Sequence, residues 1–154
     1  MRELRKIGLT VLVLAASVFL GGLWSQGGIW ATEAGGVKII KSQVTSKAKF
    51  YPYKAGKIYM EVIAVRASDG TVRTALNTCQ VCYDSGRGFY TQQGNELICN
   101  NCGNRFHIDQ IEKVRFGCNP IPIMNEDKTD DGKVITISKA FLEKHAVYFK
   151  RWKR

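Results

Sequence analysis

Apolar and polar side chains alternate in several short runs after residue 50, and this is the periodicity of β-strands. Residues 58–63, "IYMEVI", place an apolar side chain at every second position. The dipeptide Asp-Gly at 69–70 then gives a hairpin signal, and the chain returns through residues 72–76. Further short strands are expected at residues 96–98 and 133–138.

The end of the chain changes to a helical period. Ser138 is a suitable N-cap for a helix over residues 139–152. Five apolar side chains of that segment fall roughly on one side of such a helix: Phe141, Leu142, Val147, Tyr148 and Trp152. The pattern therefore predicts a small β-rich α+β domain with one C-terminal helix.

The first 31 residues differ from everything that follows. Arg2, Arg5 and Lys6 precede residues 7–24, which carry no charge. A basic start before an apolar run is typical of a secretory signal, and the run is also close to the lower length limit of a spanning helix. Both alternatives, a cleaved signal peptide or a single membrane anchor, stay open, and both place the remainder outside the cytoplasm.

The expected organisation has three parts. Residues 1–31 form the signal or anchor helix, 32–49 a linker or loose first strand, and 50–154 the folded domain. Removing the first 31 residues lowers Lys plus Arg from 23 to 20 and Asp plus Glu from 13 to 12, which leaves a net charge of about +8. This charge suits an anionic membrane surface or an acidic partner. Nucleic acid is not expected for an exported chain, and the oligomeric state stays open.

All five cysteines lie within 40 residues of one another, at Cys79, Cys82, Cys99, Cys102 and Cys118. The first four have the spacing C-x2-C-x16-C-x2-C, which is typical of four-cysteine metal sites in loop-rich segments. Iron–sulfur centres use the same four thiolates as zinc, so an iron–sulfur cluster and zinc are both expected candidates. Disulfide chemistry is the less favoured alternative, because a disulfide within C-x-x-C closes a very short loop.

Three further residues lie near the paired cysteines in the sequence, and each has a possible part in the site. Three alternatives stay open for Cys118: a ligand that displaces one of the other four, a redox-active thiol close to the centre, or an inert buried cysteine. Arg105 is expected beside the ligands, where its charge would tune a redox potential. His107 could replace a thiolate, as histidines do at Rieske centres, but a position next to the ligands is favoured, since a single histidine does not make a Rieske pair.

Four stretches of the sequence together resemble the FtrD-like membrane iron–sulfur proteins. They are "VRASDGTVRTALNTCQVCY", "GFYTQQGNELICNNCGNRFHIDQI", "GCNPIPI" and "ISKAFLEKHAVYFKRW", and they cover most of residues 50–152 in the family's order. The resemblance implies an extracytoplasmic, membrane-associated domain with an iron–sulfur centre. It also implies a link to ferrous-iron uptake, with electrons passing from an iron oxidase toward the membrane. All five cysteines carry over as its candidate site.

Three functions follow as expectations. The first is electron transfer by an iron–sulfur domain outside the cytoplasm. The second is a zinc-stabilised structural or partner-binding module, because zinc has no redox chemistry. The third is a thiol–disulfide or metal-delivery protein. An independent enzyme is not expected, since no Ser-His-Asp set and no pair of carboxylates with an identifiable role is found.

Overall fold

A computed structural model describes residues 35–153. The expected signal or anchor segment, residues 1–31, lies outside the described residues. Within the described part, no helix is long and apolar enough to cross a membrane.

Ten short strands and one α-helix form the framework of the described residues. The strands are β1 Val37–Ile40, β2 Lys49–Ala55, β3 Ile58–Arg66, β4 Val72–Cys79, β5 Tyr90–Gln93, β6 Glu96–Cys99, β7 Arg105–His107, β8 Pro120–Pro122, β9 Lys128–Asp130 and β10 Val134–Ile137. The helix α1 is Lys139–His145. These elements confirm a β-rich domain with one C-terminal helix.

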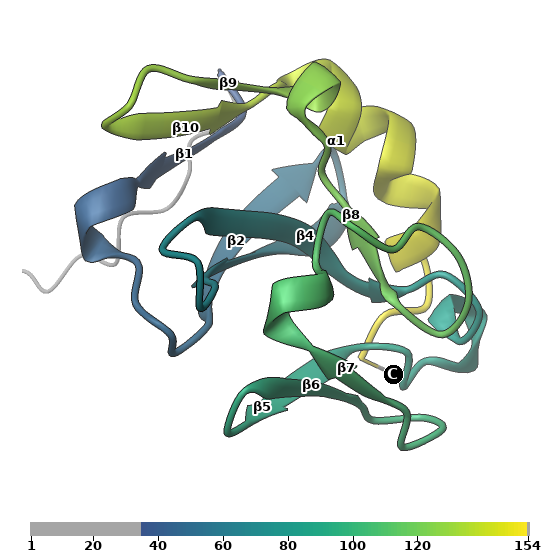
Figure 1. Ribbon diagram of the computed structural model, residues 1–154. Coiled ribbons are helices and arrows are strands. Elements are labelled where there is room, and N and C mark those ends of the chain that lie inside the picture. Colours follow the sequence, from purple (N-terminus) through teal and green to yellow (C-terminus); the bar gives the residue numbers. More distant parts are fainter. Residues whose placement is uncertain (1–34, 154) are drawn as a thin grey trace, which may run out of the picture.

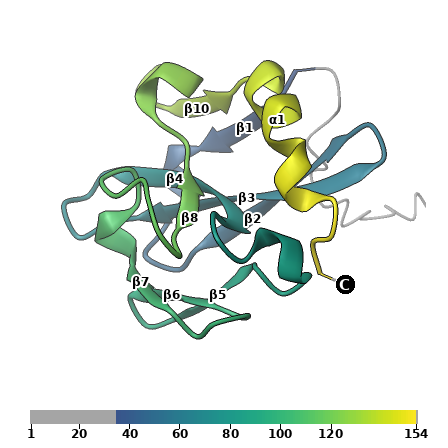
Figure 2. The ribbon, with the colours of Figure 1, turned by 90° about the vertical axis from the view of Figure 1, so that its right-hand side faces the viewer.

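The strands make three antiparallel sheets. Their orders are β1-β10-β9, β2-β3-β4-β8 and β5-β6-β7. The four-stranded sheet lies in the middle, with the β1-β10-β9 sheet above it and the β5-β6-β7 sheet below it (Figure 1). The helix α1 lies beside the upper and middle sheets, as the view turned by 90° also shows (Figure 2).

Strand β3 separates two hydrophobic cores because successive side chains of a strand point to opposite faces. Met60, Val62 and Ala64 lie in the upper core, with the β1-β10-β9 sheet and α1. Ile63 and Val65 lie in the lower core, with the β5-β6-β7 sheet. This strand is therefore buried on both faces, and the lower core is the one that reaches the cysteines.

The strand predictions agree with the structure where the pattern was clear. β3 and β4 form the expected hairpin, with the register Val62 opposite Leu76. The expected strands at 96–98 and 133–138 are β6 and β10. Within residues 32–49, for which a linker or a first strand was expected, β1 pairs with β10.

The helix begins as expected but is shorter than residues 139–152. The hydroxyl of Ser138 accepts a hydrogen bond from the amide of Phe141, so the predicted N-cap is confirmed. The α-helix ends at His145, and a 3₁₀ turn follows over Ala146–Phe149. The indole N–H of Trp152 donates to the carbonyl of Asn77 at 2.7 Å, so the chain bends back toward β4 instead of continuing as a helix.

Candidate metal centre

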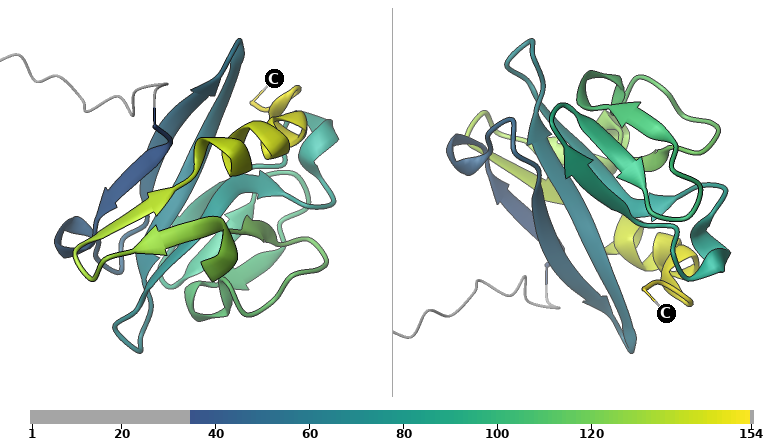
Figure 3. Two further views of the ribbon diagram at one scale, coloured as in Figure 1. Left: turned by 90° about the horizontal axis from the view of Figure 1, so that it is seen from above. Right: turned by 90° about the horizontal axis from the view of Figure 1, so that it is seen from below.

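The cysteines come from three segments that converge at one end of the lower core. Cys79 is the last residue of β4, and Cys82 lies in the turn that follows it. Cys99 is the last residue of β6, and Cys102 lies in the turn after that strand. Cys118 lies in the loop that leads into β8. Viewed from below, the β5-β6-β7 sheet lies across the middle sheet (Figure 3). The last residues of β4 and β6, Cys79 and Cys99, have their sulfurs within 4.8 Å of each other.

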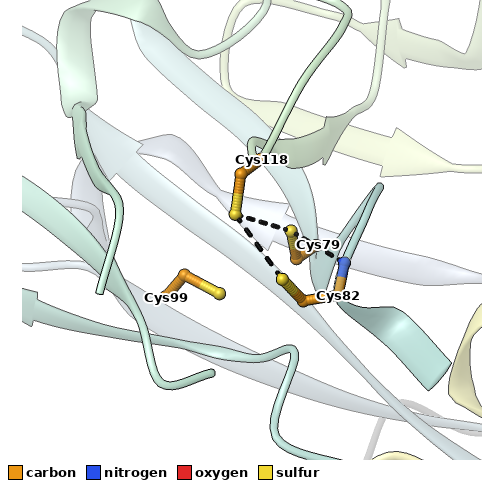
Figure 4. A group of neighbouring side chains, drawn as sticks. All are labelled: Cys79, Cys82, Cys99 and Cys118. Atoms are coloured by element: carbon orange, nitrogen blue, oxygen red, sulfur yellow. Dashed lines mark hydrogen bonds between the residues drawn. The ribbon is translucent and has the colours of Figure 1, made fainter. Parts of the chain in front are cut away.

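Four sulfurs lie within 4.8 Å of one another. We call this group the sulfur quartet, and it consists of Cys79, Cys82, Cys99 and Cys118. Three of these residues are buried and Cys118 is half-buried. Their side chains point toward one shared space between the segments (Figure 4). The quartet thus differs from the two C-x-x-C pairs, because Cys118 is a member and Cys102 is not.

Cys118 is the sulfur that links the others. Its Sγ lies 3.2 Å from that of Cys79 and 3.8 Å from that of Cys82. It also lies 2.8 Å from the Sγ of Cys102, whose side chain is exposed. The structure therefore brings all five predicted cysteines to one place, with Cys102 on the solvent side.

The first C-x-x-C turn is held by its own backbone and by Gly88. The amide of Cys82 donates to the sulfur of Cys79 at 3.3 Å, as expected for a turn that supports negative charge on sulfur. The hydroxyl of Ser85 donates to the carbonyl of Cys82 at 2.7 Å. The Cys79 amide donates to the Gly88 carbonyl at 2.6 Å. A Cβ atom at Gly88 would lie 2.3 Å from the Cys82 carbonyl oxygen, so this close approach requires glycine.

The second C-x-x-C turn closes in a similar way. The amide of Gly103 donates to the carbonyl of Cys99 at 2.8 Å, and the amide of Cys99 donates to the carbonyl of Asn104 at 2.9 Å. Gly103 has a φ of 74°, a conformation that glycine adopts without strain. The turn leaves Cys102 at the surface while Cys99 is buried.

The loop that carries Cys118 is held in place through the carbonyl group of Cys118 itself. The hydroxyl of Tyr90 donates to the Cys118 carbonyl at 3.0 Å, and the amide group of Asn104 donates to the same oxygen at 2.8 Å. Tyr90 is fully buried in the lower core, opposite Cys99 in the β5–β6 pair. These two donors hold Cys118 over the ends of β4 and β6.

The thiols differ in how readily they ionise. The pKa of Cys102 is lowered to about 7, first because of its hydrogen bond with the Cys118 thiol. Burial acts to raise the pKa of Cys79, but hydrogen bonds from the Tyr90 hydroxyl and the Cys82 amide outweigh it, and the pKa is lowered. These two residues therefore carry negative charge most easily.

Burial has the opposite result at the other three thiols. It raises the pKa of Cys99 to about 12 and also raises that of Cys82. Burial is likewise the first cause of the raised pKa of Cys118, followed by its hydrogen bonds with Cys102 and Cys79. A nearby cation reverses such shifts, because a coordinated thiol loses its proton.

The donor set fits iron or zinc. Cysteine thiolates are the ligands of iron–sulfur centres and of structural zinc. Hard cations such as calcium and magnesium prefer oxygen ligands, which the quartet does not provide. The buried position of three sulfurs gives an ion a shielded environment, and the thiolates would supply the charge that balances it.

Arg105 and His107 contact residues other than the cysteines. Arg105 forms an ion pair with Glu96 at 2.6 Å on the β6–β7 pair. The Nδ1 atom of His107 accepts a hydrogen bond from the amide of Asp109 at 3.2 Å. His107 lies opposite Glu96, three residues along β6 from Cys99, and it is not a member of the quartet.

The sequence did not indicate two of the residues that hold the cysteines in place, Tyr90 and Asn104. Tyr90, Asn104 and Gly88 each contact the backbone or side chain of a cysteine. Gly88 stands out in the sequence as a glycine inside the cysteine block, but nothing in the sequence shows that Tyr90 and Asn104 converge on one carbonyl. That convergence depends on the pairing of β5 with β6, which brings distant segments together.

Comparison with protein-family models decides the family. The model of the membrane iron-sulfur containing protein FtrD-like family matches residues 44–149. This chain belongs to the FtrD-like family. The match covers every strand from β2 to β10 and all five cysteines, and the family's name describes a membrane iron–sulfur protein. A search of curated proteins found no match, and a search of solved structures found none either.

Proposed function

We propose that this domain is a one-electron carrier, with an iron centre bound by cysteine thiolates outside the cytoplasm. The observation that carries the proposal is the convergence of four sulfurs from three segments within 4.8 Å. Membership of a membrane iron–sulfur family supports iron as the metal. When bound, iron would supply a centre that accepts one electron and gives it up again.

The residues around the sulfurs support such a role in three ways. Cys79 and Cys99 are buried, which keeps water from most of the site. The Cys82 amide donates a hydrogen bond to the sulfur of Cys79, and such a donor stabilises added negative charge. The exposed side at Cys102 gives a redox partner a short path to the centre.

The exchange needs no bond to form or break in the protein. One electron would enter from a reduced donor, and one electron would leave to an oxidised acceptor in the membrane. The resemblance in the sequence implies a link to ferrous-iron uptake, so we propose an iron-oxidising protein as the donor class and a membrane redox protein as the acceptor class. The placement outside the cytoplasm rests on the basic and apolar start of the sequence.

Metal analysis of protein purified without oxygen tests the proposal. The full chain should contain iron in stoichiometric amount and show a visible colour that bleaches on reduction and returns on oxidation. A colourless protein with one zinc would support a zinc-stabilised binding module instead. A metal-free protein whose free-thiol count rises with reductant would support thiol–disulfide or metal-delivery chemistry, for which the 2.8 Å separation of Cys102 and Cys118 is the relevant observation.

A further inference from the structure

A surface hollow of about 520 Å³ lies between the tip of the β2–β3 hairpin and the end of the chain. Both views of Figure 3 show these two segments on the same side of the molecule. Three lysines line the hollow: Lys57, Lys150 and Lys153. The apolar and aromatic side chains that line it include Ile58, Tyr59 and Trp152. We call these six residues the basic–aromatic face.

We propose that the basic–aromatic face binds an anionic lipid surface. The inference deepens the proposed function, because it names the side of the domain that meets the membrane in which the electron acceptor is proposed to lie. The lipid contact itself does not depend on which metal the cysteines hold, so the two proposals can fail separately.

The lysines of the face are the first argument. Lys57 and Lys150 are exposed, and within the part of the chain that the structure describes neither forms an ion pair. Lys153 pairs with Glu61 at 3.3 Å, and its Nζ lies 4.3 Å from the centre of the Trp152 ring. Each lysine close to an anionic bilayer favours binding by about fivefold. The hollow therefore offers charges that complement lipid phosphates.

The aromatic rings are the second argument. The ring centres of Tyr59 and Trp152 lie 5.5 Å apart. Tyr59 is 42% exposed and Trp152 is half-buried, so both rings reach the surface. Tyrosine and tryptophan favour the headgroup region of a bilayer, because each has an apolar body and a polar edge. Rings of this kind beside lysines are typical of a surface that lies on a membrane.

An acidic protein is the competing occupant, and the composition of the face argues against it. In the described part of the chain, the charged residues that line the hollow are all lysines. Lysine is depleted in the cores of protein–protein interfaces, whereas arginine is enriched. Arg151, which follows Lys150, pairs with Asp84 at 3.7 Å instead. The face thus fits lipid headgroups better than a protein.

The chain that precedes the described residues supports the same choice. Residues 7–24 carry no charge, and the described residues begin at 35. If the uncharged run stays attached as an anchor, residues 25–34 connect it to the domain, and such a segment reaches at most about 36 Å when fully extended. An anchored domain therefore stays within reach of the bilayer surface.

The basic–aromatic face adjoins the metal site. The indole N–H of Trp152 donates to the carbonyl of Asn77, which lies two residues before Cys79 in β4. The Trp152 ring also lies 6.1 Å from the ring of Phe89, the residue after Gly88, whose carbonyl accepts a hydrogen bond from the Cys79 amide. Contact of this face with a bilayer would bring the cysteines toward the membrane.

Trp152 supplies the readout for the test. The full chain has tryptophans at 24, 30 and 152, so Trp24→Phe/Trp30→Phe leaves Trp152 alone. This protein is mixed with phosphatidylcholine vesicles or with vesicles in which about a third of the lipid is phosphatidylglycerol, each with brominated acyl chains. Trp152 emission should move to shorter wavelength and be quenched in the anionic vesicles only. High salt should reverse both changes, because it screens the lysines.

Charge reversal within the face gives the matched comparison. In the same background, Lys57→Glu/Lys150→Glu should lower the ratio of docked to undocked domain by at least about tenfold, as the quenching of Trp152 measures. Lys47→Glu/Lys113→Glu is the control, because it changes the net charge equally at two exposed lysines that do not line the hollow. The control should keep the quenching of its parent. An equal loss in the two variants would overturn the proposal.

Two other results would also overturn the lipid assignment. One is a Trp152 that stays unquenched when the protein is mixed with anionic vesicles. The other is a Trp152 that responds to polyglutamate and not to the vesicles, which would assign the face to an acidic protein. Both results leave the iron centre standing. Protein isolated without iron, whose Trp152 is still quenched in anionic vesicles, would overturn the electron carrier and keep the lipid contact.

Discussion

The amide of Cys79 donates a 2.6 Å hydrogen bond to the carbonyl of Gly88, and this contact brings the Gly88 backbone against the Cys82 carbonyl. The first C-x-x-C turn is therefore closed by a residue without a side chain, because a Cβ atom at this position would clash with the Cys82 carbonyl. Folding of the metal site depends on this backbone approach as much as on the cysteines themselves.

Gly88→Ala should disturb the metal site directly. The added Cβ would lie 2.3 Å from the Cys82 carbonyl oxygen, so the turn must move, at a cost of about 1–3 kcal/mol. We expect weaker Co²⁺ binding and a lower free energy of unfolding. Gly35→Ala is the matched control, because its Cβ would meet nothing within 4 Å. Equal cobalt affinity in the two variants would contradict this account of the turn.

Glu112→Gln should destabilise the domain through a buried ion pair. The carboxylate of Glu112 pairs with Lys128 and accepts hydrogen bonds from the amide and hydroxyl of Thr74, and the side chains of the ion pair are 10% and 5% exposed. Removing one charge leaves Lys128 buried without its partner, which costs about 3–5 kcal/mol. Urea unfolding of the metal-free protein measures the loss.

The control for this prediction is an exposed pair that joins the same two segments, one before β8 and one after it. Arg115 pairs with Glu126 at 3.3 Å, and both side chains are more than half exposed. Glu126→Gln should therefore change the free energy of unfolding by about 1 kcal/mol or less. A similar cost for the two variants would show that burial of the Glu112 pair does not matter for stability.

Tyr90→Phe should change the electronic properties of the site more than its stability. The hydroxyl donates to the Cys118 carbonyl at 3.0 Å and interacts with the sulfur of Cys79. Losing a donor near the ligands favours the oxidised state, so the reduction potential of the iron-loaded protein should become more negative. The stability cost should be about 1 kcal/mol. Tyr59→Phe, whose hydroxyl faces Glu61 at the surface, should leave the potential unchanged.

Metal removal should loosen the lower sheet before the rest of the domain. The quartet joins β4, β6 and the loop before β8, so bound metal stabilises the folded state by about 4 kcal/mol when present at 1,000 times its dissociation constant. We expect a lower melting temperature after chelation. Hydrogen exchange should speed up most in β5, β6 and β7. Uniform exchange changes across all three sheets would contradict a local role for the metal.

Local patterns were sufficient to predict the elements whose sequence carries a regular signal. Alternation in β3 and the Asp-Gly dipeptide at 69–70 gave the central hairpin, and Ser138 gave the start of α1. The predicted end of the helix was wrong because the indole N–H of Trp152 donates to the carbonyl of Asn77. This is a tertiary contact that the periodicity of the sequence does not reveal. The same limit applies to β1, whose pairing with β10 spans almost the whole domain.

The spacing of the five cysteines in the sequence was enough to identify them as the candidate site. It was not enough to predict how they are arranged in space. The two C-x-x-C motifs suggest a symmetric site, whereas the sulfur quartet takes Cys118 and leaves out Cys102. That choice depends on the Cys118 loop, which Tyr90 and Asn104 hold from other parts of the chain. The spacing of cysteines in the sequence contains no information about these contacts.

The central claim is that the converging thiolates hold a redox-active iron centre. Elemental analysis of the full chain, purified without oxygen and measured beside a Cys79→Ser/Cys99→Ser variant, tests it most directly. The account predicts iron in stoichiometric amount in the wild-type chain and a marked loss of iron in the variant. Wild-type protein without stoichiometric iron, or equal iron in both proteins, would contradict it.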